Sequence, residues 1–188
     1  MNNKEMNIYK FRVTIEDNSD KVIFRDIEIK STQTFEDFHQ IILKAFNFDN
    51  SQMASFYVSD EDWNKAQEIA LFDMQLTEEE GLKVLIMSET EINTQINCIG
   101  QHLVYTYDFL NMWNFFIELT EITIKEKGTN YPIITYTKGK APKQGSKNDS
   151  FDDIEDELLF SENDEYEEDE YSSDDISEGF DEYENYEQ

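Results

Sequence analysis

The stretch YTYDFLNMWNFFIEL, residues 105–119, decides the central part of the fold. Aromatic and apolar residues stand at alternate positions on both sides of a short polar centre, which predicts two antiparallel strands joined by a turn at 110–112. One apolar layer would contain Tyr105, Tyr107, Phe109, Trp113, Phe115, Ile117 and Leu119. The stretch therefore reads as a core hairpin.

Polar side chains interrupt this hairpin and raise the question of function. Asp108 falls on the opposite face, next to the turn, where its carboxylate can accept backbone N–H groups. An acid in such surroundings can also mark a reactive site, so a turn cap and a functional site are both kept as hypotheses. The candidate binding residues are Tyr105, Tyr107, Asp108, Asn111 and Trp113, and we predict no catalytic residue and no metal ligand.

The N-terminal segments predict a second hairpin. Its first strand, within residues 7–17, has alternating core positions at Tyr9, Phe11, Val13 and Ile15. Its second strand, within residues 21–31, has apolar residues at Val22, Phe24, Ile27 and Ile29. The phase of these apolar positions slips near Arg25, which predicts a β-bulge there.

Residues 34–47 predict the strongest helix of the chain, packed on that hairpin. Thr34 and Asp37 fit a capping box at its start. Apolar residues follow at helical spacing: Phe35, Phe38, Ile41, Ile42 and Ala45. His39, next to Phe38, is expected at the surface or at its boundary.

The remaining segments complete the predicted fold class. Short strands are expected at 54–59 and 68–72, and helical segments near 77–82 and 88–100, the latter with Ile92, Ile96 and Ile99 on one face. Together these elements predict an α+β fold, with antiparallel sheet built from β-hairpins and two to three helices. The hairpin-then-helix order also suits a β-grasp-like N-terminal half.

The acidic residues divide the chain into parts. Residues 149–188 hold 20 of the 43 acids and no Lys or Arg, which leaves 23 acids and 15 bases for the rest. We therefore predict a domain over 5–137, a Lys-rich linker over 138–148 and a disordered acidic tail over 149–188. Tail positions that could dock in cis or in trans are Phe151, Ile154, Leu158, Tyr166 and Tyr171.

Composition and motifs argue against several function classes. Cys98 is the only cysteine, which excludes thiolate metal clusters, and we expect it to be a buried small apolar residue. No phosphate-binding glycine loop and no zinc-protease or serine-hydrolase motif occurs, so no cofactor is predicted. The net charge of −28 opposes direct nucleic-acid binding. A cytoplasmic protein with no membrane partner is expected.

Four segments occur in the order of the motifs of one known family: YKFRVTIED (9–17), FEDFHQIILKAFNFDNSQMASFYV (35–58), LVYTYDFLNMWNFFIEL (103–119) and YPIITYTKGKAP (131–142). Over about residues 7–145 the sequence resembles the Ri-plasmid ORF-3-like family, also labelled TnpR-like passenger proteins of an insertion element, as a divergent member. The resemblance implies a compact α+β domain with antiparallel strands and few helices. It implies no established activity.

The chain departs from the family pattern in the hairpin. Leu110 stands where the pattern has glycine, Asn111 and Met112 where it has an acidic pair, and Phe115 where it has histidine. If relatives use those groups for metal or acid–base chemistry, this chain lacks the ligands.

These observations favour a non-enzymatic protein-interaction or adaptor module with an acidic regulatory tail. The expected partner is a protein, and the tail's charge suits a basic one. Two alternatives stay open. One is a degenerate or cryptic enzyme centred on Asp108, with His39 or His102 nearby. The other is a nucleic-acid mimic linked to mobile elements, in which the acidic, aromatic tail occupies a basic groove.

Overall fold

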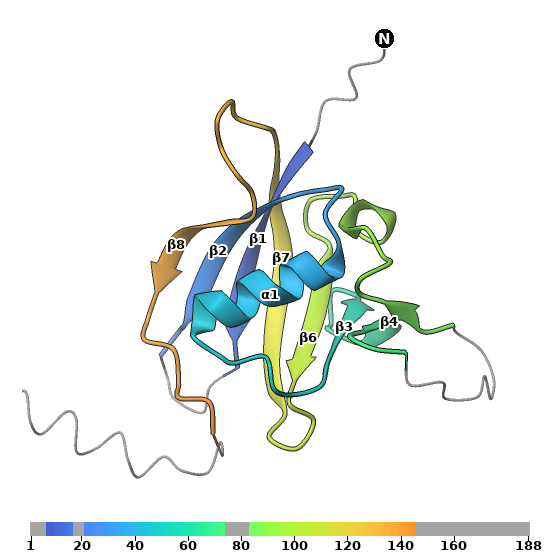
Figure 1. The fold of residues 1–188 in the computed structure, drawn as a ribbon, viewed down its shortest axis with the longest axis vertical. Coiled ribbons are helices and arrows are strands. Elements are labelled where there is room, and N and C mark those ends of the chain that lie inside the picture. The colour runs from blue at the N-terminus through green and yellow to red at the C-terminus, as the bar shows by residue number, and fades with distance from the viewer. Residues whose placement is uncertain (1–6, 17–20, 74–82, 146–188) are drawn as a thin grey trace, which may run out of the picture. The chain divides into compact units, whose positions relative to one another are not determined.

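One mixed sheet of eight strands organises the computed structural model, which describes residues 7–16, 21–73 and 83–145 (Figure 1). In chain order the elements are β1 (Asn7–Ile15), β2 (Phe24–Lys30), α1 (Phe35–Phe46), β3 (Ala54–Ser59), β4 (Lys65–Ala70), β5 (Leu85–Ile86), a short 3-10 helix η1 (Ile92–Thr94), β6 (His102–Tyr107), β7 (Trp113–Ile124) and β8 (Ile133–Lys138). Across the sheet the order is β5-β4-β3-β6-β7-β1-β2-β8. All neighbours are antiparallel except β4 and β5.

The hairpin predicted at 105–119 is β6 and β7, at the centre of the sheet. Tyr107 pairs with Trp113 and Tyr105 with Phe115, so the alternating apolar side chains share one buried face. Phe109 was expected in the same layer, but it lies beyond the end of β6 and is 39% exposed. The turn begins one residue earlier than the alternation alone suggests.

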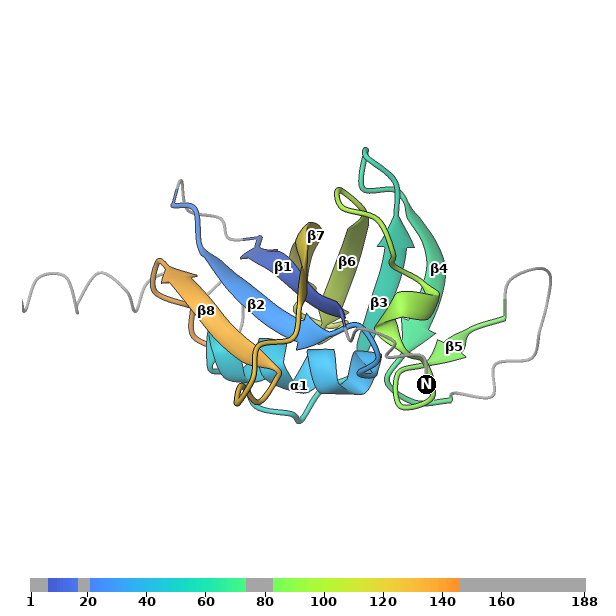
Figure 2. The same ribbon diagram turned by 90° about the horizontal axis from the view of Figure 1, so that it is seen from above.

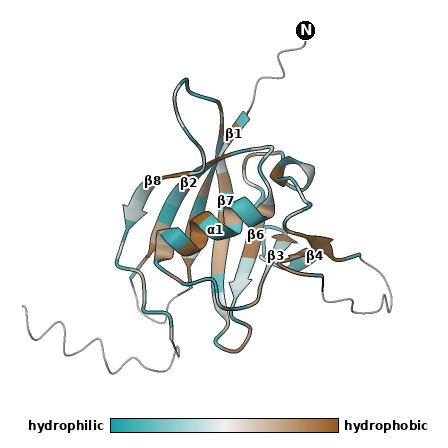
Figure 3. Cartoon of the chain, viewed as in Figure 1, coloured by the Kyte–Doolittle hydropathy of each residue, from teal (hydrophilic) through white to brown (hydrophobic). Residues whose placement is uncertain are grey.

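Helix α1 covers one face of this sheet, as its amphipathic spacing predicts. Its N-terminus has the expected capping box: the Thr34 hydroxyl accepts from Asp37 N, and the Asp37 carboxylate accepts from Thr34 N. Phe38 lies 4.7 Å from the Phe11 ring and 5.5 Å from the Phe56 ring, measured between centroids. Figure 2 shows the helix along one side of the sheet, and Figure 3 shows hydrophobic and hydrophilic residues alternating along it.

The prediction of a phase slip near Arg25 is wrong, because the buried Arg25 side chain is held by hydrogen bonds to backbone carbonyls. β1 and β2 pair without interruption from Ile8–Lys30 to Thr14–Phe24. Arg25 itself occupies a core-facing position, only 4% exposed, while Val22 is 58% exposed. The Arg25 guanidinium donates to the carbonyls of Phe24, Ala45 and Lys138, so a charged side chain stands where the pattern led us to expect an apolar one.

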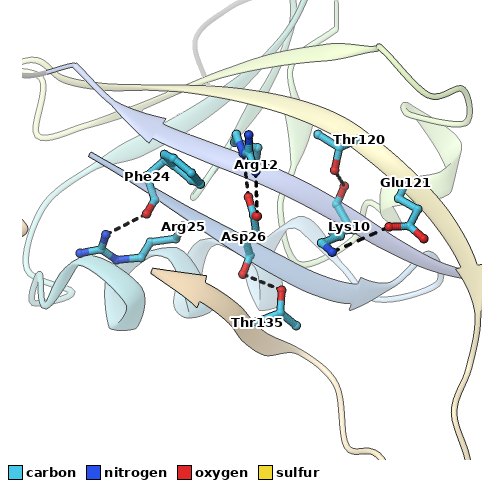
Figure 4. Close-up of polar contacts among 8 residues, drawn as sticks. All are labelled: Lys10, Arg12, Phe24, Arg25, Asp26, Thr120, Glu121 and Thr135. Atoms are coloured by element: carbon cyan, nitrogen blue, oxygen red, sulfur yellow. Dashed lines mark hydrogen bonds and ion pairs between the residues drawn. The ribbon is translucent and has the colours of Figure 1, made fainter. Parts of the chain in front are cut away.

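Register shifts occur in three strand pairs of the described residues, β1–β7, β2–β8 and β3–β4, and in the first two the extra residue is a threonine (Figure 4). In β7 the extra residue is Thr120, whose hydroxyl donates to the Lys10 carbonyl at 2.9 Å. In β8 it is Thr135, whose hydroxyl donates to the Asp26 carbonyl at 3.3 Å. A bulge leaves groups of the partner strand without their ladder bond, and here the threonine side chain supplies the replacement.

The fold is mostly sheet, which corrects part of the predicted fold class. The described residues contain one α-helix, not two to three. The segment expected to be helical at 88–100 forms only η1, and Ile99 is 61% exposed although Ile92 and Ile96 are buried. The N-terminal hairpin and helix that suggested a β-grasp-like half are present, but β1 and β2 are part of the eight-stranded sheet and do not form a separate half.

Several expectations fall on parts of the chain that the structure does not describe. These are the connection at 17–20 between the two predicted N-terminal strands, the helical segment near 77–82 and the tail, with Phe151, Ile154, Leu158, Tyr166 and Tyr171. The last residues of the Lys-rich linker, 146–148, also lie outside the described residues. None of the helices in the described part of the chain combines the length and apolar character needed to cross a membrane.

Candidate functional site

Three of the predicted binding residues lie in the core. Tyr105 and Tyr107 are 0% exposed and Trp113 is 3% exposed. The Tyr105 hydroxyl lies 2.7 Å from His39 Nδ1, and the Tyr107 hydroxyl donates to the Asp49 carbonyl at 2.7 Å. Both polar tips therefore have partners within the fold, and the rings contribute to the layer beneath α1.

His39 was expected at the surface or at its boundary, but it is completely buried. Its ring bridges Tyr105 to Asn50, whose side-chain oxygen lies 2.8 Å from His39 Nε2. Burial lowers the pKa of His39, which favours the neutral imidazole. Sequence spacing gave no signal of this, since both partners lie in other elements.

Asp108 adopts the turn-capping arrangement. Its backbone is left-handed, with φ of 56°, a conformation that Asp tolerates better than most residues. One carboxylate oxygen accepts from the backbone N–H groups of Leu110 and Asn111, at 3.1 and 3.3 Å. The other accepts from the Asn111 side chain at 2.7 Å, so Asp108 and Asn111 together fix the turn.

A titration of Asp108 separates this role from acid–base catalysis. Burial acts to raise its pKa, but the bonds from Asn111 and Leu110 together lower it below the ordinary value for an aspartate. The stabilisation from these bonds is therefore present above that unfolded value and is lost as pH falls through the folded pKa. We expect NMR titration of the Asp108 carboxyl carbon to give a pKa below that of an unperturbed aspartate. A pKa shifted toward neutrality would favour the enzymatic hypothesis instead.

The sheet face opposite α1, here called the outer face, carries a different set of side chains. These side chains alternate with core residues along their strands, and the turn residue Trp63 lies on the same face. The strand residues are Arg12, Thr14, Phe24, Asp26, Tyr57, Lys65, His102, Thr106, Phe116 and Glu118. No α-helix of the described residues covers this face. Aromatic rings and charges of both signs are mixed on it.

On the β1–β2 side of the outer face, Arg12 and Asp26 form a bidentate ion pair, with two N···O distances of 2.9 Å (Figure 4). The Arg12 guanidinium also lies over the Phe24 ring, 4.2 Å from its centroid. This geometry holds the guanidinium toward β2. The hydrogen bonds to Asp26 are the largest cause of a raised pKa for Arg12, so the charge is permanent.

On the β6–β7 side, an aromatic cluster stands on the outer face. The Trp63 ring stacks on His102 at 4.2 Å and 18°, and meets the Phe116 ring edge-to-face at 5.0 Å. Trp63 has φ of 63°, and a left-handed backbone costs a bulky residue about 1–2 kcal/mol. Such strain persists only where the surroundings enforce it, and it is often found at functional positions.

Asp60 enforces this conformation in the turn between β3 and β4. Its carboxylate accepts from the backbone N–H groups of Asp62 and Asn64 and from the Asn64 side chain, at 2.9–3.0 Å. The bonds from Asn64 lower the pKa of Asp60, so the carboxylate is charged at neutral pH. Its backbone carbonyl lies 3.2 Å from His102 Nδ1, which ties the stacked histidine to the same turn.

Between these two regions lies a pocket of about 280 Å³, lined by Arg12, Thr14, Trp63, Phe116 and Glu118. It is the candidate functional site. Its lining comes from β1, the β3–β4 turn and β7, three segments far apart in the sequence. Sequence reasoning missed it because each lining residue looks like an ordinary solvent-facing position, and the alternation in β1 and β7 gave the only signal.

Next to the pocket, polar groups on β3, β4 and β6 already have partners. Lys65 donates to the Thr106 hydroxyl at 3.0 Å and lies over the Tyr57 ring. Glu68 accepts from the hydroxyls of Ser55 and Tyr57, at 2.7 and 3.2 Å. This part of the outer face is therefore a hydrogen-bonded border to the pocket.

Cys98 and His102 do not form a reactive pair. Cys98 is exposed, which corrects the expectation of a buried thiol, and its Sγ contacts the Asn97 side chain at 3.1 Å. His102 belongs to the Trp63 stack instead. Within the described residues no group of three or more His, Cys, Asp or Glu side chains is placed to hold a metal ion.

The family model described as "Plasmid pRiA4b ORF-3-like protein" matches residues 7–185. The chain belongs to this family. The match confirms the resemblance and extends it past residue 145, where the motifs had placed its end. In this ORF-3-like member, two of the residues expected to depart from the family pattern are placed differently: Leu110 is 93% exposed at the turn, and Phe115 is fully buried.

The fold is similar to a crystal structure titled "Protein of Unknown Function MM3350 from Methanosarcina mazei Go1". The TM-score is 0.64, the sequences are 21% identical, and the similarity covers 84% of each chain. At this identity the likeness shows the fold alone. No curated protein matches the chain.

Proposed function

We propose that this protein is an interaction module without catalysis of its own, whose outer face docks a segment of a protein partner in the cytoplasm. One observation carries the proposal: Trp63 is held in a left-handed backbone conformation, stacked on His102, at the edge of a pocket on the outer face. Strained, partly exposed aromatic anchors beside a pocket are typical of binding hot spots.

The charge pattern supports a protein partner over a nucleic acid. Arg12 and Lys65 stand on the outer face, but they alternate with Asp26, Glu68 and Glu118. A surface for phosphate groups needs an excess of positive charge, which this mixture does not provide. The mixed signs suit a peptide segment that has its own pattern of charges.

Asp108 gives no comparable support to an enzymatic alternative. Both of its carboxylate oxygens hold the β6–β7 turn. The acidic tail keeps the role predicted from its composition. With 20 acids and no base, residues 149–188 would attract a basic partner and make association depend on salt.

The test is selection of a phage-displayed random peptide library on the full chain. We expect enriched peptides whose binding falls about tenfold or more in Trp63→Ala, as for a hot-spot residue. Leu110→Ala is the matched control, since Leu110 is 93% exposed but lies on the β6–β7 turn. Binding equally strong to all three proteins, or no enrichment at all, would overturn the proposal.

A further inference from the structure

The pocket on the outer face is lined by one basic and one acidic side chain, Arg12 and Glu118. Arg12 is also ion-paired with Asp26 on β2. Arg12 and Asp26 neutralise one another through two hydrogen bonds of 2.9 Å. Glu118 is exposed, and neither ion pair found within the described residues includes it. Glu118 faces Arg12 in the β1–β7 register and attracts it, but the hydrogen bonds of the guanidinium go to Asp26. The exposed Glu118 carboxylate can therefore accept hydrogen bonds from a ligand.

The Arg12 guanidinium is held on the β2 side of the pocket. Asp26 and Phe24, which hold the guanidinium, lie on β2, whereas Glu118 and Phe116 lie on β7. Because β2 and β7 flank β1 on opposite sides, these contacts draw the Arg12 head group toward β2, although Arg12 and Glu118 are cross-strand neighbours. An anion entering the pocket would meet Glu118 and would have to compete with Asp26 for Arg12.

Aromatic rings form the other wall of the pocket. Trp63 and Phe116 meet edge-to-face, 5.0 Å apart, and both line the cavity. A positive group near such rings is attracted by their negative π-faces, and indole is the best of the aromatic side chains for this. The volume of about 280 Å³ has room for one long side chain. His102 lies directly across from Glu118 in the β6–β7 register, and its ring is stacked on Trp63.

We propose that the pocket formed by Trp63, Phe116 and Glu118 binds an arginine or lysine side chain of the partner segment. The inference rests on the proposed function and names its partner chemistry. The aliphatic stem of the cation packs on the two rings, and the positive head group meets the Glu118 carboxylate. The partner is thus a basic protein segment.

The test uses short capped peptides and the indole N–H signal of Trp63 in NMR spectra of the full chain. The probes are acetyl-Gly-Arg-Gly-amide, the same peptide with citrulline in place of arginine, acetyl-Gly-Asp-Gly-amide and a short oligothymidine. We expect saturable shifts of the Trp63 signal with the arginine peptide and much weaker binding of the uncharged citrulline peptide. Trp113, which is buried, provides an internal reference signal.

Variants locate the binding on the pocket. Glu118→Gln should lower the affinity for the arginine peptide roughly three- to fivefold. Trp63→Ala should lower it roughly tenfold, and binding to this variant is monitored through the ring signals of Phe116. The matched control is Glu121→Gln, on the same strand but paired with Lys10 outside the pocket. It should leave the affinity unchanged.

Three results would overturn the inference. These are equal binding of the citrulline peptide, tighter binding of the aspartate peptide through Arg12, and tighter binding of oligothymidine. The library selection separates this failure from failure of the proposed function. If selected peptides depend on Trp63 but carry no basic residue, the docking face stands and the cation pocket is wrong.

Discussion

Replacing Phe38 by alanine is expected to lower the free energy of unfolding by about 3–5 kcal/mol. Phe38 is completely buried, and its ring lies between Phe11 of β1 and Phe56 of β3. These strands stand on opposite sides of the sheet centre, so this one ring links α1 to both halves. Truncation would remove the apolar burial and leave a cavity that the surrounding strands cannot close. Urea denaturation monitored by fluorescence and circular dichroism measures the loss.

Phe116→Ala is the matched control for Phe38→Ala. Phe116 has the same ring but lies on the outer face and is only partly buried. Its removal is expected to cost about 1 kcal/mol, within the range of ordinary substitutions. Similar losses for both variants would contradict the assignment of a single core beneath α1 and a separate functional face.

Arg25→Met is expected to lower the free energy of unfolding by about 3 kcal/mol, although it replaces a charged core residue by an apolar one. The methionine would fit the apolar surroundings, but the carbonyls of Phe24, Ala45 and Lys138 would lose donors at 2.8–3.0 Å. Ala45 lies in the last turn of α1, where carbonyls have no helical partner and carry the negative end of the helix dipole.

Lys10→Met provides the comparison for Arg25→Met. Lys10 forms an ion pair with Glu121 at 3.8 Å on the surface, where both side chains are substantially exposed (Figure 4). Such pairs contribute about 0–1 kcal/mol, so this variant should be close to neutral. If Arg25→Met proved equally neutral in thermal and urea unfolding, the role of Arg25 as a link between β2, β8 and α1 would be contradicted.

The features that the sequence predicted correctly are those decided by near neighbours. The alternation in β1, β6 and β7 follows from a period of two residues, and the α1 capping box joins residues three apart. The Asp108 cap likewise joins residues within three positions of one another. In each case the bonding partners lie in the same short segment, so local residue chemistry is sufficient.

The errors concern polar residues whose burial depends on distant partners. Arg25 was read as a break in the strand pattern and His39 as a boundary residue, but both are buried. A polar side chain is buried at low cost only where other groups form hydrogen bonds with it. Those groups come from Lys138 in one case and Tyr105 in the other, more than 60 residues away along the chain.

The sequence by itself determined the two hairpins, the capped helix and the turn role of Asp108, because each is specified by contacts within a few residues. Only the tertiary structure decided which face of the sheet α1 covers, and therefore which residues are left on the outer face. The pocket of Trp63, Phe116 and Glu118 exists because pairing of β6 with both β3 and β7 brings a turn and a central strand together. No local pattern encodes that meeting, since strand order is set by the packing of the whole sheet.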